Sequence, residues 1–228
     1  MEKQKVTEKD FSLDGKTLRI TAVSECSARV RISDSFAQSY MERYGILHTE
    51  GTCVGTVSDI GLDCGKLKIT FDGDKLTFSS PTVTHSVMFG DSPDEVTSYF
   101  NSAAENFGVK NSGTDASEKG GVPYFERAPK TISFETIDEN FYGLGESNDK
   151  NLILNGRVYT EKVVYQKNEF PVPFFMSSLG WGIMLNTTFW HCVDVCCRDR
   201  DKVLCWIPDG DIDFFIFMSP VFNIRRFH

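Results

Sequence analysis

The chain has 228 residues, of which 40% are apolar and 25% are charged, and its formal net charge is −8. This composition is that of a globular protein with a sizeable core. Lys and Arg do not cluster, so neither nucleic acid nor an anionic membrane surface is an expected partner. The sequence has no apolar run of about 18 residues and no apolar signal segment at its start, so we expect no membrane span and a cytosolic location.

Short runs of Val, Ile, Thr and Phe, separated by Gly, Asp and Asn, dominate the first part of the chain. Such runs predict β-strands. Two alternating apolar runs flank Asp72-Gly73-Asp74, and this arrangement predicts a β-hairpin. The strands predicted in this part are Thr17–Val23, Ala28–Ile32, Lys66–Phe71, Lys75–Ser79 and Thr82–Met88.

One short amphipathic helix is predicted to begin after Ser92, a candidate N-cap. Pro93 would occupy the first helical position and Glu95 the capping-box position. Apolar residues then recur at helical spacing until Gly108, and we interpret this stripe as core packing. The polar, Gly-rich segment near 108–121 has no periodicity and is predicted to be an insertion within a single domain. The apolar stripe consists of Val96, Tyr99, Phe100, Ala103 and Phe107.

The C-terminal part contains all three Trp residues, and its apolar runs predict further strands. Two of these runs surround Leu179-Gly180 and predict a second hairpin. Many short strands and a single helix indicate an all-β fold, an antiparallel sandwich. The strands predicted in this part are Thr131–Thr136, Val172–Ser177, Trp181–Asn186, Thr188–Val195, Val203–Trp206 and Ile212–Met218.

Seven cysteines, an odd number in a chain of this length, argue against a disulfide framework. Cys192, Cys196, Cys197 and Cys205 are close in sequence but lack the paired spacing of a structural zinc site. We therefore expect free thiols, no metal and no cofactor.

Asp211 and Asp213 share one face of a predicted strand. Paired carboxylates can serve glycoside hydrolysis when they flank the scissile bond. Acidic residues beside a turn are more often solvated, and we interpret both residues in that way.

A series of motifs follows along the second half of the chain, after Arg29–Ile32 and Arg43-Tyr44 in the first half. In this order, the motifs resemble the N-terminal β-sandwich domain of glycoside hydrolase family 31, which includes α-glucosidases and α-xylosidases. They are FYGLGE at 141–146, LNG at 154–156, PFFMS at 173–177, GWGIMLN at 180–186, NTTFWHCVD at 186–194 and GDIDFFIFMSP at 210–220.

The resemblance implies a galactose mutarotase-like β-supersandwich that precedes a (β/α)₈ barrel. In this family the barrel carries two catalytic Asp residues, and the reaction is retaining hydrolysis of an α-glycosidic bond. Only Val221–His228 follow the last motif, whereas a barrel needs about 250 residues. We therefore expect residues 1–228 to be a non-catalytic module without catalytic residues, inactive alone. Its expected partners are the barrel of the same enzyme and an α-linked glycoside or oligosaccharide.

In the family, a loop after the GLGE strand reaches over the barrel mouth and helps to form the −1 sugar subsite. The resemblance places this loop at Gly156–Phe170, where the usual Trp-Asn-x-Asp pattern does not occur. The candidate sugar-binding residues are Tyr165, Gln166 and Glu169. Tyr165 would stack on a sugar face, and Gln166 or Glu169 would bind hydroxyl groups. The alternative is a solvated hairpin loop.

Two other functions stay open at this point. A free-standing carbohydrate-binding sandwich would use exposed aromatic side chains as stacking platforms. A mutarotase-like enzyme would use a His and a Glu as acid and base, with His85 or His191 facing a concave sheet near a carboxylate. The positions of the two histidines test the second of these functions.

Overall fold

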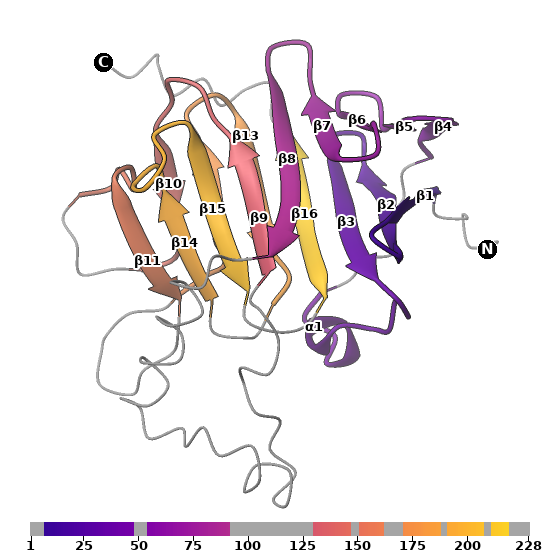
Figure 1. The fold of residues 1–228 in the computed structure, drawn as a ribbon, viewed down its shortest axis with the longest axis horizontal. Helices are drawn as coiled ribbons and strands as arrows, with labels where there is room; N and C mark the ends of the chain where they lie inside the picture. The colour runs from indigo at the N-terminus through magenta and orange to yellow at the C-terminus, as the bar shows by residue number, and fades with distance from the viewer. Residues whose placement is uncertain are drawn as a thin grey trace, which may run out of the picture.

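The computed structural model describes residues 7–47, 54–91, 130–146, 151–161, 171–187, 191–207 and 211–218. These residues form two antiparallel sheets that pack as a sandwich, with one short helix at one end (Figure 1). The predicted all-β, antiparallel sandwich is thereby confirmed. No helix in the described ranges is long and apolar enough to span a lipid bilayer.

The seven-stranded sheet joins the two ends of the sequence, because β3 pairs with the last strand, β16. Its register places Arg29 opposite Phe215 and Arg31 opposite Asp213. In spatial order the strands are β1 (Glu8–Leu13), β2 (Lys16–Ser24), β3 (Ser27–Ser33), β16 (Ile212–Met218), β13 (Trp181–Leu185), β12 (Phe174–Ser177) and β10 (Phe141–Gly143).

The nine-stranded sheet also combines strands from both halves of the chain, because β8 pairs with β9 and β9 with β15. The hairpin predicted at Asp72-Gly73-Asp74 is confirmed as β6–β7, and the hairpin predicted at Leu179-Gly180 is confirmed as β12–β13 of the other sheet. In spatial order the strands are β11 (Arg157–Glu161), β14 (His191–Val195), β15 (Lys202–Ile207), β9 (Lys130–Glu135), β8 (Thr84–Asp91), β7 (Lys75–Ser79), β6 (Lys68–Phe71), β5 (Gly61–Asp63) and β4 (Thr56–Ser58).

The core lies between the sheets, because alternate residues of each strand point inward. Its centre is aromatic. The ring of Phe134, from the nine-stranded sheet, lies 5.9 Å from Phe175, 6.2 Å from Trp181 and 5.7 Å from Phe214, all from the seven-stranded sheet. These four side chains are almost completely buried, so they join the two sheets into one hydrophobic unit.

Three predictions on local structure have different outcomes. The predicted helix after Ser92 and the insertion near 108–121 lie outside the described residues. The helix that the structure describes is another one, α1 (Tyr40–Arg43), in the connection between β3 and β4. The loop placed at Gly156–Phe170 begins instead as a strand, because Arg157–Glu161 pairs with β14 along its whole length.

Candidate functional site

The FYGLGE motif forms a tight bend at the edge of the seven-stranded sheet. Gly143, Leu144 and Gly145 all have positive φ angles, of 120°, 61° and 87°. A Cβ atom on Gly143 would lie only 2.5 Å from the carbonyl oxygen of Phe174. The backbone N–H of Leu144 donates to that same oxygen at 2.7 Å. The predicted tight turn and close backbone approach are therefore confirmed, and both depend on Gly143 lacking a side chain.

Tyr165, Gln166 and Glu169 lie outside the described residues, so the structure describes only the two ends of the segment that carries them. The first end is β11, the outermost strand of the nine-stranded sheet. The second end is Val172, whose N–H donates to the carbonyl oxygen of Leu144 at 3.5 Å, just before β12 of the seven-stranded sheet. The described residue that follows the segment, Val172, therefore lies beside the FYGLGE bend.

Directly before β10, the buried carboxylate of Glu139 connects several motifs. Its Oε2 accepts hydrogen bonds from Oγ of Ser177 and, at 2.8 Å, from Nε1 of Trp181. Its backbone carbonyl accepts from Nδ2 of Asn155 at 2.9 Å. Each of these donors belongs to a different motif. Ser177 and Trp181 compensate for burying the carboxylate, and Asn155 pairs with the backbone carbonyl. We refer to Glu139, Ser177, Trp181, Asn155 and His85 as the Glu139 network.

His85 on β8 joins this network from the opposite sheet. Its Nδ1 lies 3.1 Å from the carbonyl oxygen of Glu135, and since a carbonyl can only accept, Nδ1 carries the proton. Its Nε2 lies 3.8 Å from Oε1 of Glu139, and its ring lies 4.6 Å from that of Trp181. Burial lowers the pKa of His85, and the Glu139 charge and the hydrogen bond to Glu135 only partly offset this effect. The imidazole is therefore neutral at neutral pH.

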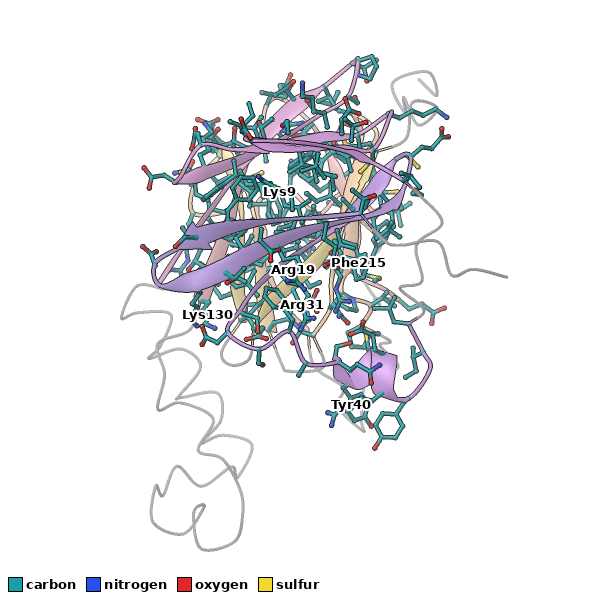
Figure 2. All side chains as sticks on the ribbon, turned by 90° about the vertical axis from the view of Figure 1, so that its right-hand side faces the viewer. Lys9, Arg19, Arg31, Tyr40, Lys130 and Phe215 are labelled. Atoms are coloured by element: carbon teal, nitrogen blue, oxygen red, sulfur yellow. The ribbon has the colours of Figure 1, made fainter. Side chains whose placement is uncertain are left out.

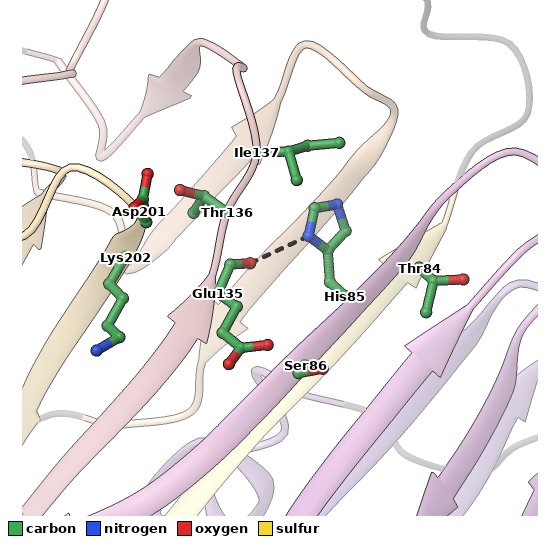
Figure 3. Close-up of a pocket in the computed structure, with 8 residues that line it drawn as sticks. All are labelled: Thr84, His85, Ser86, Glu135, Thr136, Ile137, Asp201 and Lys202. Atoms are coloured by element: carbon green, nitrogen blue, oxygen red, sulfur yellow. Dashed lines mark hydrogen bonds between the residues drawn. The ribbon is translucent and has the colours of Figure 1, made fainter.

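A hollow of about 370 Å³ lies at the ends of β8, β9 and β15 and is lined by 84–86, 135–137 and 201–202 (Figure 3). Most of its lining residues are polar. Nζ of Lys75 donates a hydrogen bond to the Glu135 carboxylate at 3.0 Å. The hydrogen bond from Lys75 lowers the pKa of Glu135, which keeps this carboxyl ionised. The hollow can therefore accept a small polar molecule, and its wall brings the Ser86 hydroxyl to the ionised Glu135 carboxylate.

The histidine positions do not fit the mutarotase-like alternative. His85 is 3% exposed and His191 is 4% exposed. An acid–base catalyst must come within hydrogen-bonding distance of its substrate. Neither imidazole faces solvent on a concave sheet, as that alternative requires.

A second buried cluster lies on the outer face of the seven-stranded sheet. Nε and Nη2 of Arg29 donate to the two carboxylate oxygens of Asp213 at 2.8 and 2.6 Å. Nη1 and Nη2 of the same guanidinium donate to the carboxylate of Glu42 at 2.7 and 3.0 Å. Nδ2 of Asn186 also donates to Asp213, at 2.7 Å. We refer to Arg29, Glu42, Asn186 and Asp213 as the Arg29 network, in which one guanidinium joins two carboxylates. Nε of Arg31 also lies 3.5 Å from Oδ2 of Asp213.

The interpretation of Asp211 and Asp213 as solvated turn residues is correct for only one of them. Asp211 is exposed and accepts a hydrogen bond from the hydroxyl of Ser33. Asp213 is buried and bound to Arg29, so the two carboxylates do not act as a pair. The reason is long-range: the cation that Asp213 meets is on β3, far away in the sequence.

The cysteines of the described ranges are free thiols, as predicted, and Cys192 and Cys205 are buried. Burial raises the pKa of the Cys205 thiol, so this group is protonated and unreactive. Over the part of the chain that the structure describes, no group of three or more His, Cys, Asp or Glu side chains is placed to bind a metal ion.

No protein-family model and no curated protein matches the chain, but solved structures do. A GH31 dextranase from Flavobacterium johnsoniae, in complex with isomaltotriose, has a TM-score of 0.63 and 15% identity, over 95% of this chain and 26% of the dextranase. A xylosidase from Aspergillus niger has a TM-score of 0.57 and 14% identity, over 94% and 30% of the two chains. A GH31 α-xylosidase from Xanthomonas citri has a TM-score of 0.50 and 16% identity, over 82% and 19%.

The fold is that of the β-sandwich domain of glycoside hydrolase family 31. The resemblance found in the motifs is therefore confirmed at the level of the fold. The chain spans less than a third of the length of each of these solved proteins.

Proposed function

We propose that the chain is the non-catalytic N-terminal module of a family 31 α-glycosidase, which packs on a catalytic barrel and shapes its sugar site. One observation carries this proposal: the polar residues of the family-like motifs hold the two buried networks of the sandwich. Hydrogen bonds to Glu139 come from Asn155, Ser177 and Trp181, and Asn186 donates one to Asp213. The motifs thus occupy the positions that fix the geometry of this sandwich, beyond a general likeness of fold.

Within this proposal, Tyr165, Gln166 and Glu169 contact the sugar. Of the described residues on either side of their segment, Glu161 ends β11 and Val172 donates its N–H to Leu144 of the FYGLGE bend. The expected ligand is an α-linked oligosaccharide, and the expected compartment is the cytosol.

The first test is an activity assay on the purified chain with chromogenic α-glucoside and α-xyloside substrates. We expect no hydrolysis, because retaining hydrolysis needs two carboxyl groups about 5–5.5 Å apart on either side of the scissile bond. Neither buried network presents such a pair to solvent. Turnover by the chain alone would contradict the proposal.

The second test is the DNA sequence that follows the codon of His228. A family 31 barrel encoded there supports the proposal, and an unrelated reading frame contradicts it. In the joined enzyme, Tyr165→Ala, Gln166→Ala and Glu169→Ala are each expected to lower kcat/KM. Leu152→Ala, at an exposed apolar residue outside the segment, is the control and is expected to leave kcat/KM unchanged.

A further inference from the structure

Two tyrosines at α1 form an exposed aromatic surface, and Figure 2 shows Tyr40 on the helix, away from both sheets. Tyr40 is the first residue of α1 and is 48% exposed, and Tyr44 follows the last residue of α1 and is 67% exposed. Their ring centroids are 4.5 Å apart, with the planes tilted by 37°. Ile46, which is also exposed, lies two residues after Tyr44 in the chain. We refer to Tyr40, Tyr44 and Ile46 as the tyrosine surface.

None of the four residues of α1 is buried, so packing against the hydrophobic core does not hold the helix in place. A helix of this length is unstable by itself in water. Its anchor is polar: Glu42 makes a bidentate ion pair with the buried Arg29, and Ser39 and Glu42 form a capping box. The anchor therefore fixes the backbone that carries both tyrosines to the rigid outer face of the seven-stranded sheet.

The segment that leads into α1 is fastened in the same manner. The ring of Phe36 lies 4.1 Å from the guanidinium carbon of Arg19 and 5.3 Å from that of Arg31. Nη2 of Arg31 donates to the carbonyl oxygen of Ala37 at 2.7 Å. Two cation–π contacts and one hydrogen bond thus add to the Arg29–Glu42 pair. Several charged groups therefore fix α1 to the seven-stranded sheet, although α1 contributes no side chain to the core.

We propose that the tyrosine surface binds a sugar ring of a soluble oligosaccharide, at a site separate from the 162–170 segment. A pyranose ring has an apolar face of C–H groups and polar edges. A tyrosine side chain matches it with an apolar ring, whose face is negative, and a polar hydroxyl at its tip. The exposed guanidinium of Arg43, between the two tyrosines in sequence, supplies donors for sugar hydroxyl groups. The two ring planes are already in place, so little side-chain entropy is lost on binding.

The size of the surface favours a sugar over a protein partner. A fully covered aromatic side chain buries about 150–250 Å², so these two half-exposed rings offer roughly 200–300 Å² together. A stable protein interface needs about 800 Å² on each partner. Among the described residues, the two rings therefore offer much less area than a stable protein interface needs, and they match one or two sugar rings.

The experiment is a titration of the full chain with isomaltotriose and maltotriose, followed by NMR of ¹³C-labelled tyrosine rings. We expect millimolar binding, with shifts in the ring signals that disappear in Tyr40→Ala and Tyr44→Ala. Tyr44→Ala is expected to weaken binding about five- to tenfold, and Tyr40→Ala/Tyr44→Ala to abolish it. Sorbitol, which has hydroxyl groups but no ring, is the ligand control and is expected not to bind.

Leu152→Ala is the matched protein control, because Leu152 is exposed and apolar but not part of the tyrosine surface. The tyrosine variants are expected to fold, since neither ring contributes to the core, and circular dichroism checks this. Unchanged binding in Tyr40→Ala/Tyr44→Ala, or loss of binding in Tyr165→Ala instead, would overturn the proposal. So would the absence of binding at tens of millimolar sugar, or a dimer in sedimentation that the double variant abolishes.

These outcomes are independent of the barrel-packing proposal. That proposal is tested by the DNA sequence downstream of His228 and by the activity of the joined enzyme. Its outcome does not depend on whether the tyrosine surface binds sugar.

Discussion

The guanidinium of Arg29 and the carboxylate of Asp213 form a buried bidentate ion pair across 184 positions of sequence. The pair lies between β3 and β16, which are adjacent strands of the seven-stranded sheet. Because Arg29 also binds Glu42, one cation joins an early strand, the last described strand and α1. The Arg29 network therefore links the register of the sheet to the position of α1.

Replacing Arg29 by Met is expected to destabilise the fold strongly. The variant would leave Asp213 and Glu42 as two largely buried carboxylates without their common cation. Removing one partner of a buried pair costs about 3–5 kcal/mol. Urea denaturation measures the loss. Arg19→Met is the matched control, since Arg19 makes the same bidentate contact to Asp10 at 2.8 Å but nearer to solvent, and its expected cost is below about 1 kcal/mol. Equal losses in both variants would contradict the special role of Arg29.

Glu42 is expected to make the fold sensitive to acid. Burial alone would raise its pKa, but hydrogen bonds from Arg29 and Ser39 outweigh this effect and lower the pKa from 4.5 to about 2. Between these two values the unfolded chain binds a proton that the folded chain does not. Stability from this group is therefore complete above pH 4.5 and is lost as the pH falls towards 2.

Glu42→Gln removes this titration and tests the assignment. We expect the variant to be less stable at neutral pH but to lose less stability on acidification. Urea midpoints measured from neutral pH down to about pH 2 give the two slopes. A variant whose acid slope equals that of the wild type would show that another carboxyl group is responsible.

Eleven of the sixteen described strands have a counterpart among those predicted from the sequence, because alternation of apolar and polar residues is a local property. The strands without a counterpart are β1, β4, β5, β10 and β11. The predicted β7 and β16 even have the bounds of the observed strands, Lys75–Ser79 and Ile212–Met218. β1 was missed because its residues Glu8–Leu13 are only half-buried and include three charged side chains. It forms by pairing with β2, and local composition does not reveal such pairing.

The helix α1 was also missed, although its sequence contains the decisive pattern. Ser39 and Glu42 have the spacing of a capping box, and the structure contains both of its hydrogen bonds. No apolar periodicity follows this capping box, so the sequence pattern alone does not predict a helix there. The buried position of Asp213 could not be predicted in this way, since its partner Arg29 is distant in sequence and becomes a neighbour only through strand pairing.

His85 is expected to limit stability at mildly acidic pH. Burial lowers its pKa from 6.5, so below pH 6.5 the unfolded chain binds a proton more readily than the folded chain. Stability is therefore complete above pH 6.5 and falls as the pH decreases towards the lowered pKa. His85→Phe keeps a ring against Trp181 but cannot be protonated. We expect its thermal midpoint to depend less on pH just below 6.5 than that of the wild type, and an unchanged dependence would assign the effect to another group.

Gly143→Ala is expected to disrupt the FYGLGE bend by two separate effects. A φ of 120° is unfavourable for any residue with a Cβ, and this Cβ would lie 2.5 Å from the carbonyl oxygen of Phe174. Gly73→Ala separates the two effects, because Gly73 has a φ of 111° but nothing within 4 Å of the added Cβ. We expect a loss of about 1–2 kcal/mol for Gly73→Ala from backbone strain alone. The loss for Gly143→Ala is expected to be clearly larger, because the backbone of β12 must also move. Chemical denaturation measures both losses, and equal values would show that the close approach to Phe174 costs nothing.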